Sequence, residues 1–149
     1  MQFVLTLHSI TRWAVLLFGV WTVINAITGV TGKRSFTAVD NRSNLLFMIS
    51  CDIQLLLGLI LYFGNEWFDK LKNFSQYKSD AVARFFGMEH ATMMLLAWVL
   101  VHIGRTSVKK AGTDAGKHKK MLIFFGIALL LILASIPWPF RSALGRGWI

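Results

Sequence analysis

Long apolar runs alternate with short polar segments along this chain. Each run holds about 20 mostly apolar residues, the length that a helix needs to cross the hydrocarbon core of a bilayer. The four runs cover roughly residues 3–30, 44–63, 84–104 and 121–140. Backbone groups inside lipid must be hydrogen-bonded within their own segment, so each run is expected to be a helix. Because the connections are short, the pattern predicts an all-α integral membrane four-helix bundle with residues 1–149 in a single domain.

Positive charge is concentrated in two of the segments between these runs. The segments "TGKRSFTAVDNR" and "GRTSVKKAGTDAGKHKK" together carry nine Lys and Arg side chains, whereas the opposite side of the bundle carries six. Cytoplasmic loops of membrane proteins are enriched in Lys and Arg. The pattern therefore predicts that both basic loops face the cytoplasm and that both termini lie on the outer side of a bacterial inner membrane. His118, inside the second loop, is expected to be solvated.

The connection on the other side, "NEWFDKLKNFSQYKSD", has apolar side chains at helical spacing among its charges. Trp67, Phe68 and Phe74 fit a helix that lies in the membrane interface. An ordinary loop with aromatic side chains at the headgroup level fits equally well. Ser79 or Asp80 is expected to cap the helix that follows.

Composition supports a membrane protein and decides how the net charge is interpreted. The chain is 55% hydrophobic and 15% charged, with a mean hydropathy of +0.56, which is too apolar for a soluble domain of this length. A net charge of +9 favours nucleic acid in a soluble protein, but here the basic residues flank apolar runs and suit a headgroup surface. Nucleic acid is therefore not a predicted partner. The single cysteine, Cys51, cannot form an internal disulfide.

Ionisable side chains inside the apolar runs are costly, so each of them needs a partner or a function. His8 and His90 enter from the outer side to similar depths, roughly 8–10 Å at 1.5 Å per residue. Arg12 lies one turn deeper than His8, Asp52 reaches mid-depth from the other side, and Glu89 adjoins His90. An ion pair of Arg12 with Asp52 or Glu89 is expected, either as a structural contact or as part of a proton relay.

Helical periodicity turns several of these side chains toward the bundle interior. His8 and Arg12 share one face of the first helix. That face continues through small and aliphatic side chains: Val15, Gly19, Thr22 and Ala26. On the third helix, His102 is rotated by about 120° from His90 and lies near the basic loop. His8 and His90 are therefore the strongest candidate pair.

Two imidazoles from different helices at one depth can fill both axial positions of a haem iron. Bundle cores commonly hold cofactors between facing helices. We therefore predict one haem b held by His8 and His90, with Arg12 and Glu89 in its surroundings. Basic side chains near the outer surface are candidates to face its propionates: Arg84, Arg141 and Arg146. The competing interpretation is a pair of interfacial histidines that hydrogen-bond to water or backbone.

"LHSITRW" at residues 7–13 leads into an apolar helix, and "EHATMMLLAWVLVHIGR" carries histidines near both ends of one helix. Both motifs resemble those of small membrane-bound b-type cytochromes. The whole chain resembles short four-helix bacterial proteins of the cytochrome b type. The resemblance implies that His8 and His90 are haem ligands. His102 departs from the two-haem pattern, since it does not share a face with His90 and the second helix offers no histidine. At most one haem is therefore expected.

These features predict a membrane-embedded haem protein of electron transport, working as a subunit or partner of a larger respiratory complex and exchanging electrons with quinol. The sequence contains no H-E-x-x-H motif and no Gly-rich phosphate loop, so an electron carrier is favoured over a stand-alone enzyme. Two alternatives stay open. One is a non-haem accessory or structural subunit of a membrane complex. The other is a small proton-conducting or transport protein that uses Arg12, Asp52 and Glu89.

Overall fold

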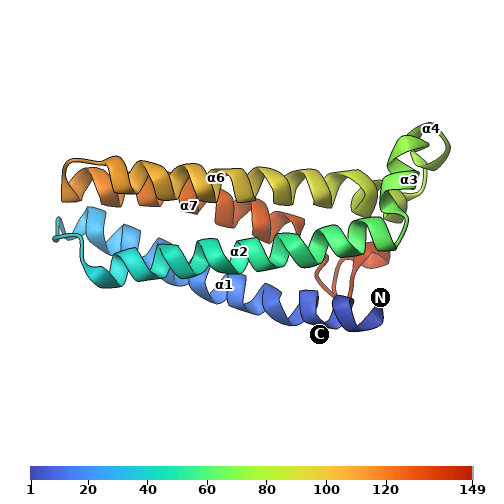
Figure 1. The fold of residues 1–149 in the computed structure, drawn as a ribbon, viewed down its shortest axis with the longest axis horizontal. Coiled ribbons are helices and arrows are strands. Elements are labelled where there is room, and N and C mark those ends of the chain that lie inside the picture. The colour runs from blue at the N-terminus through green and yellow to red at the C-terminus, as the bar shows by residue number, and fades with distance from the viewer. Residues whose placement is uncertain (149) are drawn as a thin grey trace.

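Four helices long and apolar enough to cross a bilayer run side by side in the computed structural model (Figure 1). They are α1 (Gln2–Thr31), α2 (Ala38–Gly64), the continuous segment Ala81–Lys110 and α7 (Asp114–Ser135). The structure describes residues 1–148, and no β-strand occurs among them. The predicted all-α architecture with four candidate membrane helices is confirmed.

The third spanning segment is interrupted by one irregular turn. It consists of α5 (Ala81–Arg84), a π-helical turn η1 (Phe85–Glu89) and α6 (His90–Lys110). Asp80 caps this segment as predicted, because its carboxylate accepts hydrogen bonds from the backbone N–H groups of Val82 and Ala83 at 2.9 and 3.1 Å.

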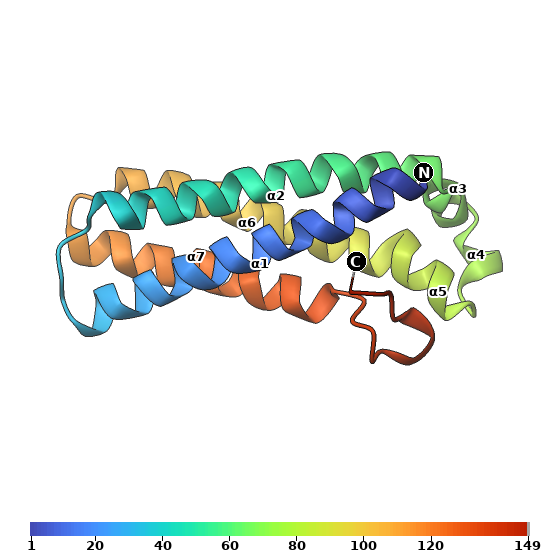
Figure 2. The ribbon, with the colours of Figure 1, turned by 90° about the horizontal axis from the view of Figure 1, so that it is seen from below.

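The helices form a closed ring in which each long helix packs on two others. α1 packs on α2 and α7, and α6 packs on the same two helices, so α1 and α6 stand diagonally opposite (Figures 1 and 2). The short connections α1–α2 and α6–α7 lie at one end of the bundle. The opposite end carries α3 (Trp67–Lys72) and α4 (Phe74–Tyr77), so the predicted helical character of this connection is present.

The interior face of α1 is the one that the sequence predicted. Arg12 and Thr22 are buried there, along with the small residues between and beyond them. Gly19 allows a close approach of the helices, because a Cβ at this position would lie 3.0 Å from both Leu129 and Phe47. Helix association in lipid depends on such close packing, since burial of apolar surface gives no advantage over contact with lipid tails.

The outward faces of the long helices are apolar. Leu17 on α1, Leu56 on α2 and Leu130 on α7 have 65%, 63% and 68% of their surface exposed. A surface of this kind is unsuited to water and suits hydrocarbon.

Helix ends differ from the predicted spans at two places. α6 continues to Lys110 and α7 already begins at Asp114, so most of the predicted basic loop is helical. Helices extend beyond their apolar runs because charged side chains at their ends reach the headgroup region. In the other direction α7 ends at Ser135 instead of near residue 140, because Pro137 cannot continue a helix.

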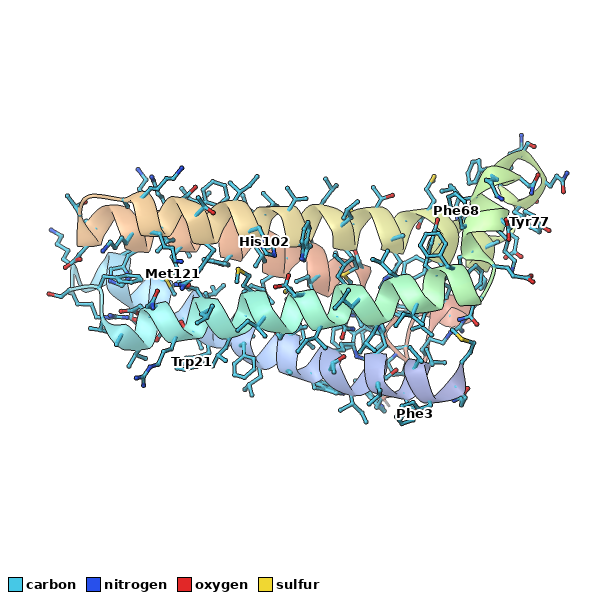
Figure 3. All side chains as sticks on the ribbon, in the orientation of Figure 1. Phe3, Trp21, Phe68, Tyr77, His102 and Met121 are labelled. Atoms are coloured by element: carbon cyan, nitrogen blue, oxygen red, sulfur yellow. The ribbon has the colours of Figure 1, made fainter. Side chains whose placement is uncertain are left out.

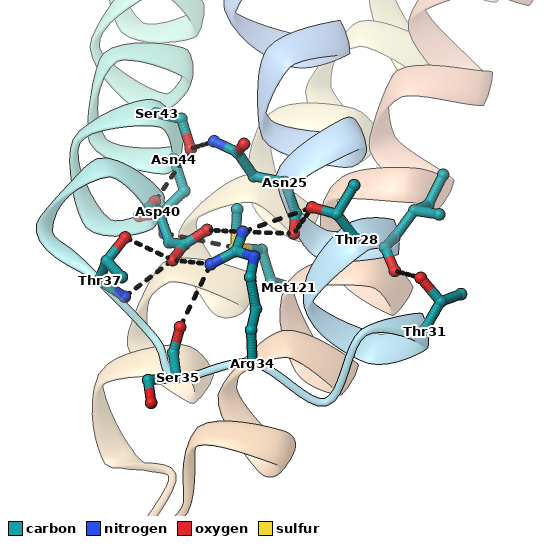
Figure 4. A network of polar contacts seen from close by, with 11 residues as sticks. Asn25, Thr28, Thr31, Arg34, Ser35, Thr37, Asp40, Ser43, Asn44 and Met121 are labelled. Carbon is teal, nitrogen blue, oxygen red and sulfur yellow. Dashed lines mark hydrogen bonds and ion pairs between the residues drawn. The ribbon is translucent and has the colours of Figure 1, made fainter.

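A charged cluster joins α1 to α2 at the end that carries the two short connections (Figure 4). Asp40, in the first turn of α2, is fully buried. Its carboxylate accepts two hydrogen bonds from the Arg34 guanidinium at 2.6 and 2.7 Å and one from the Thr37 N–H at 2.8 Å. Arg34 also donates to the Asn25 carbonyl of α1 at 3.0 Å. The hydrogen bond to Asp40 raises the pKa of Arg34, so the pair remains charged.

We expect Arg34→Ala to lower the free energy of unfolding by about 3 kcal/mol, because it leaves the buried Asp40 carboxylate without its charged partner. Equilibrium unfolding in mixed micelles measures this loss. Adding Asp40→Asn should recover part of it, and Arg42→Ala, an exposed arginine nearby, serves as the control. An equal loss in the single and double variants would show that the pair does not act as a unit.

Candidate functional site

His8 on α1 and His90 at the start of α6 lie against each other across the diagonal of the bundle. Their ring centres are 6.5 Å apart and their planes are inclined by 68°. A metal–nitrogen bond of about 2 Å on each side would separate two imidazole centres by about 6 Å. The spacing is therefore compatible with two axial ligands of a single iron.

An irregular turn and two neighbouring helices fix the position of His90. The π-turn Phe85–Glu89 directly precedes it, and such turns leave backbone groups that need other partners. The Tyr62 hydroxyl of α2 supplies one by donating to the Gly87 carbonyl at 2.7 Å. His90 Nδ1 lies 2.9 Å from the Ser135 carbonyl of α7, which can only accept a hydrogen bond. The ring is therefore held as the Nδ1–H tautomer, and Nε2 is the nitrogen available to a ligand.

His8 has fewer fixed contacts than His90. Its ring lies beside Gly58 of α2, where an added Cβ would come within 3.4 Å of the His8 Cε1 atom. His8 Nδ1 is buried and has no hydrogen-bond partner within residues 1–148. A buried polar nitrogen without a partner is costly. His8 Nδ1 therefore lacks an orienting hydrogen bond of the kind that His90 Nδ1 makes with Ser135.

Aromatic and basic side chains surround the His90 ring. The ring centres of Phe85 and Phe86 lie 5.7 and 6.1 Å from that of His90. The guanidinium of Arg141 lies 5.0 Å over the Phe85 ring, and that of Arg146 lies 4.6 Å over the Phe86 ring. Two of the three arginines predicted to face haem propionates are therefore next to the rings that flank His90.

The predicted ion pair of Arg12 with Asp52 or Glu89 is wrong. Arg12 is buried, and its Nη2 donates to the Trp148 carbonyl at 2.7 Å and more weakly to the Gly147 carbonyl at 3.4 Å. A backbone oxygen of the C-terminal segment therefore takes the place of the expected carboxylate. The prediction failed because the chain leaves α7 and folds back onto α1, which no pattern in the sequence indicates.

Glu89 is paired at the helix surface instead. Its carboxylate lies 2.9 Å from Arg84 Nε, and more than 40% of each side chain is exposed. Glu89 is thus at the helix surface and is not the partner of Arg12. Arg84 is engaged by this carboxylate through its Nε.

His118 is buried, contrary to its predicted solvated role. It is fully inaccessible, its ring centre lies 5.3 Å from that of Phe36, and it leaves no room for a side chain at Gly29. Because α7 begins before this residue, His118 falls on the buried face that includes Met121 and Phe125. That helical spacing could have predicted the burial of His118, but the lysines on either side suggested a solvated loop instead.

A second polar cluster, not predicted from the sequence, joins α2 to α6. Asp52 Oδ1 accepts hydrogen bonds from Trp98 Nε1 at 2.7 Å and from His102 Nε2 at 2.8 Å. Figure 3 shows His102 between α6 and α2. Its predicted rotation away from His90 is what turns it toward α2 and not toward α1.

Metal binding by protein side chains alone has no support in residues 1–148, where no group of three or more His, Cys, Asp or Glu side chains gathers closely enough. The His8–His90 pair is different, because a porphyrin brings its own equatorial nitrogens and asks the protein only for axial ligands. The spacing of the two rings and the nearby arginines are compatible with such a group.

No family model, curated protein or solved structure matches this chain. Function is therefore inferred from the side-chain geometry of the bundle.

Arg12→Leu is expected to lower the free energy of unfolding by about 1–3 kcal/mol, because the Trp148 carbonyl loses its charged donor and keeps only the Trp13 indole N–H at 3.0 Å. Since neither acid contacts Arg12, the same loss should appear in the Asp52→Asn and Glu89→Gln backgrounds, within about 0.5 kcal/mol. Unfolding in mixed micelles provides the comparison. A much smaller loss in either background would restore that acid as the partner of Arg12.

Proposed function

We propose that this chain is a membrane-embedded b-type haem protein that passes electrons, with His8 and His90 as the axial ligands of one haem. The observation that carries the proposal is the pair of imidazoles at 6.5 Å between diagonal helices. A four-helix bundle with ligands on facing helices is a common way of holding a cofactor in a protein core.

Each ligand has a distinct environment. His90 is oriented by the Ser135 carbonyl, which leaves its Nε2 for the iron and increases the basicity of the ring. His8 has no such orienting bond on its buried Nδ1. The haem supplies one-electron redox chemistry when it is bound. Two axial histidines leave no open coordination position, which favours electron transfer over the binding of oxygen or substrate.

The positive groups near the pair have a role in the same proposal. Arg141 and Arg146 stand over Phe85 and Phe86, beside the His90 ring. They offer charge for carboxylates at the edge of the bundle. Arg12 holds a buried positive charge one turn from His8, which favours the reduced state of a nearby redox centre by simple electrostatics.

The proposal also includes location and partners. Both basic segments lie at one end of the bundle, and the enrichment of Lys and Arg in cytoplasmic loops supports an orientation with that end inside and the termini outside. We therefore assign it to a bacterial inner membrane, as a subunit or partner of a respiratory complex that receives electrons from quinol.

One observation favours the alternative of a small proton-conducting protein. Asp52 and His102 form a hydrogen-bonded acid–imidazole pair inside the spanning segments, and such pairs are parts of proton relays. Under this alternative the purified protein is colourless and His8→Ala leaves proton flux unchanged. The haem proposal requires instead a coloured protein whose absorption spectrum depends on His8.

Absorption spectra of purified protein test the haem assignment. The wild type should show b-type bands in a reduced-minus-oxidised spectrum. His8→Ala and His90→Ala should each lose haem or convert it from low spin to high spin, because one axial imidazole is missing. His102→Ala, a histidine on the same helix as His90, is the matched control and should keep the wild-type spectrum. A colourless wild type grown with ample haem, or a spectrum controlled by His102, contradicts the assignment.

Reporter fusions test the orientation. A periplasm-active reporter at the C-terminus and a cytoplasm-active reporter in the connection at residues 111–113 should both be active, because the basic end is expected inside. Reversal of both signals would place the termini in the cytoplasm.

A further inference from the structure

The cluster of Asp52, Trp98 and His102 lies near the middle of the spanning helices. Asp52 is about 20 Å along the axis from the start of α2 and nearly as far from its end. The side chains of Asp52 and His102 are both 37% exposed. Their exposed neighbours on the same helices are apolar, with Ile53 at 46% and Ile103 at 47%. The open side of the cluster therefore faces hydrocarbon and not water.

A purely structural ion pair would be expected to have a fully buried carboxylate. The Arg34–Asp40 pair joins α1 to α2 with its carboxylate fully buried, whereas Asp52 and His102 are left partly open at membrane depth. Ionisable groups exposed at that depth are costly and are usually functional. The contact between α2 and α6 is also less extensive than the contacts α1–α2 and α6–α7. The cluster thus combines partly exposed polar side chains with a limited contact between its two helices.

Two polar atoms of the cluster make no hydrogen bond to the described part of the protein. Asp52 Oδ1 accepts from both Trp98 and His102. No protein donor or acceptor is bonded to Asp52 Oδ2 or His102 Nδ1 in the part of the chain that the structure describes. With Nε2 donating to Asp52, the neutral His102 ring presents Nδ1 as an acceptor. Two acceptors are therefore available to a molecule that carries hydroxyl groups.

The cluster also offers an aromatic wall. The Trp98 indole and the His102 ring lie with their centres 4.4 Å apart. The indole N–H donates its hydrogen bond to Asp52, which fixes the orientation of Trp98. The faces of the indole ring are left to pack against apolar or aromatic groups. A ligand here would have to arrive through the bilayer, carry hydroxyl donors and tolerate aromatic contact.

We propose that Asp52, Trp98 and His102 form a binding site for the hydroxylated ring of a lipid-soluble quinol. A ring hydroxyl donates a hydrogen bond to Asp52 Oδ2, His102 Nδ1 accepts from the same ring, and Trp98 packs against it. The isoprenoid tail remains in the surrounding lipid. The inference deepens the proposed function by locating its electron donor and rests on it for that role, although binding at the cluster itself needs no haem.

Photolabelling of the full chain in lipid nanodiscs tests the site. The probe is a short-chain azidoubiquinone in its reduced form, with unlabelled decylubiquinol as competitor. Labelled positions should map to α2 around Asp52 and to α6 around Trp98 and His102. Asp52→Asn and His102→Gln should each raise the competitor concentration needed for half-protection about tenfold or more, because each weakens a polar contact to the ligand. Glu89→Gln removes an acid from a different ion pair and should leave protection unchanged.

Specific outcomes separate the two proposals. His8→Ala should lose the haem spectrum and keep wild-type labelling, whereas His102→Gln should do the reverse. Labelling at the cluster in a protein without haem bands overturns the proposed function alone. Haem bands with labelling elsewhere, or protection unchanged in Asp52→Asn and His102→Gln, overturn the quinol site alone.

A contact with another transmembrane helix is the competing explanation for the partial exposure of Asp52 and His102. It would appear as loss of an oligomer in Asp52→Asn with labelling unaffected, and this result overturns the site. If Asp52→Asn does not fold, the labelled positions of the wild type and the protection measured for His102→Gln still decide the question.

Discussion

The lack of water in the hydrocarbon core is the constraint on which this structure depends. Backbone groups there must be satisfied within helices, and polar side chains must find protein partners. Two polar groups of this bundle find uncharged partners. Arg12 bonds to the backbone oxygen of Trp148, and the Tyr62 hydroxyl bonds to the Gly87 carbonyl next to the π-turn. The folding back of the C-terminal segment onto α1 follows from the same requirement.

Polar contacts specify the arrangement of helices that apolar packing alone leaves open, because lipid tails are as apolar as leucine. Three clusters occur at different heights and join different helices. Arg34 and Asp40 join α1 to α2 at one end, Asp52 and His102 join α2 to α6 near the middle, and His8 meets His90 toward the other end. Because each contact joins one helix pair at one height, together they constrain the relative register of α1, α2 and α6.

The helical period and the hydropathy of the sequence were enough to predict the features that depend on local pattern. The four spans, the buried face of α1 and the Asp80 cap all follow from local patterns. The pairing of polar side chains did not, because it depends on which helices become neighbours around the ring. Depth placed Arg12 near Asp52, but Asp52 turns toward α6 and bonds to His102. His118 was misjudged for a local reason, since its lysine neighbours concealed a helical period that continues into the core.

The π-turn before His90 has a consequence for the part of the chain that precedes it. Such a turn places one additional residue in the helix, which rotates everything before it by about 100° relative to everything after it. α5 therefore sits in a different angular phase from the body of α6. Deletion of one residue from this turn would restore a regular α-helix and rotate α5 by about 100°, while His90 and His102 keep their orientation.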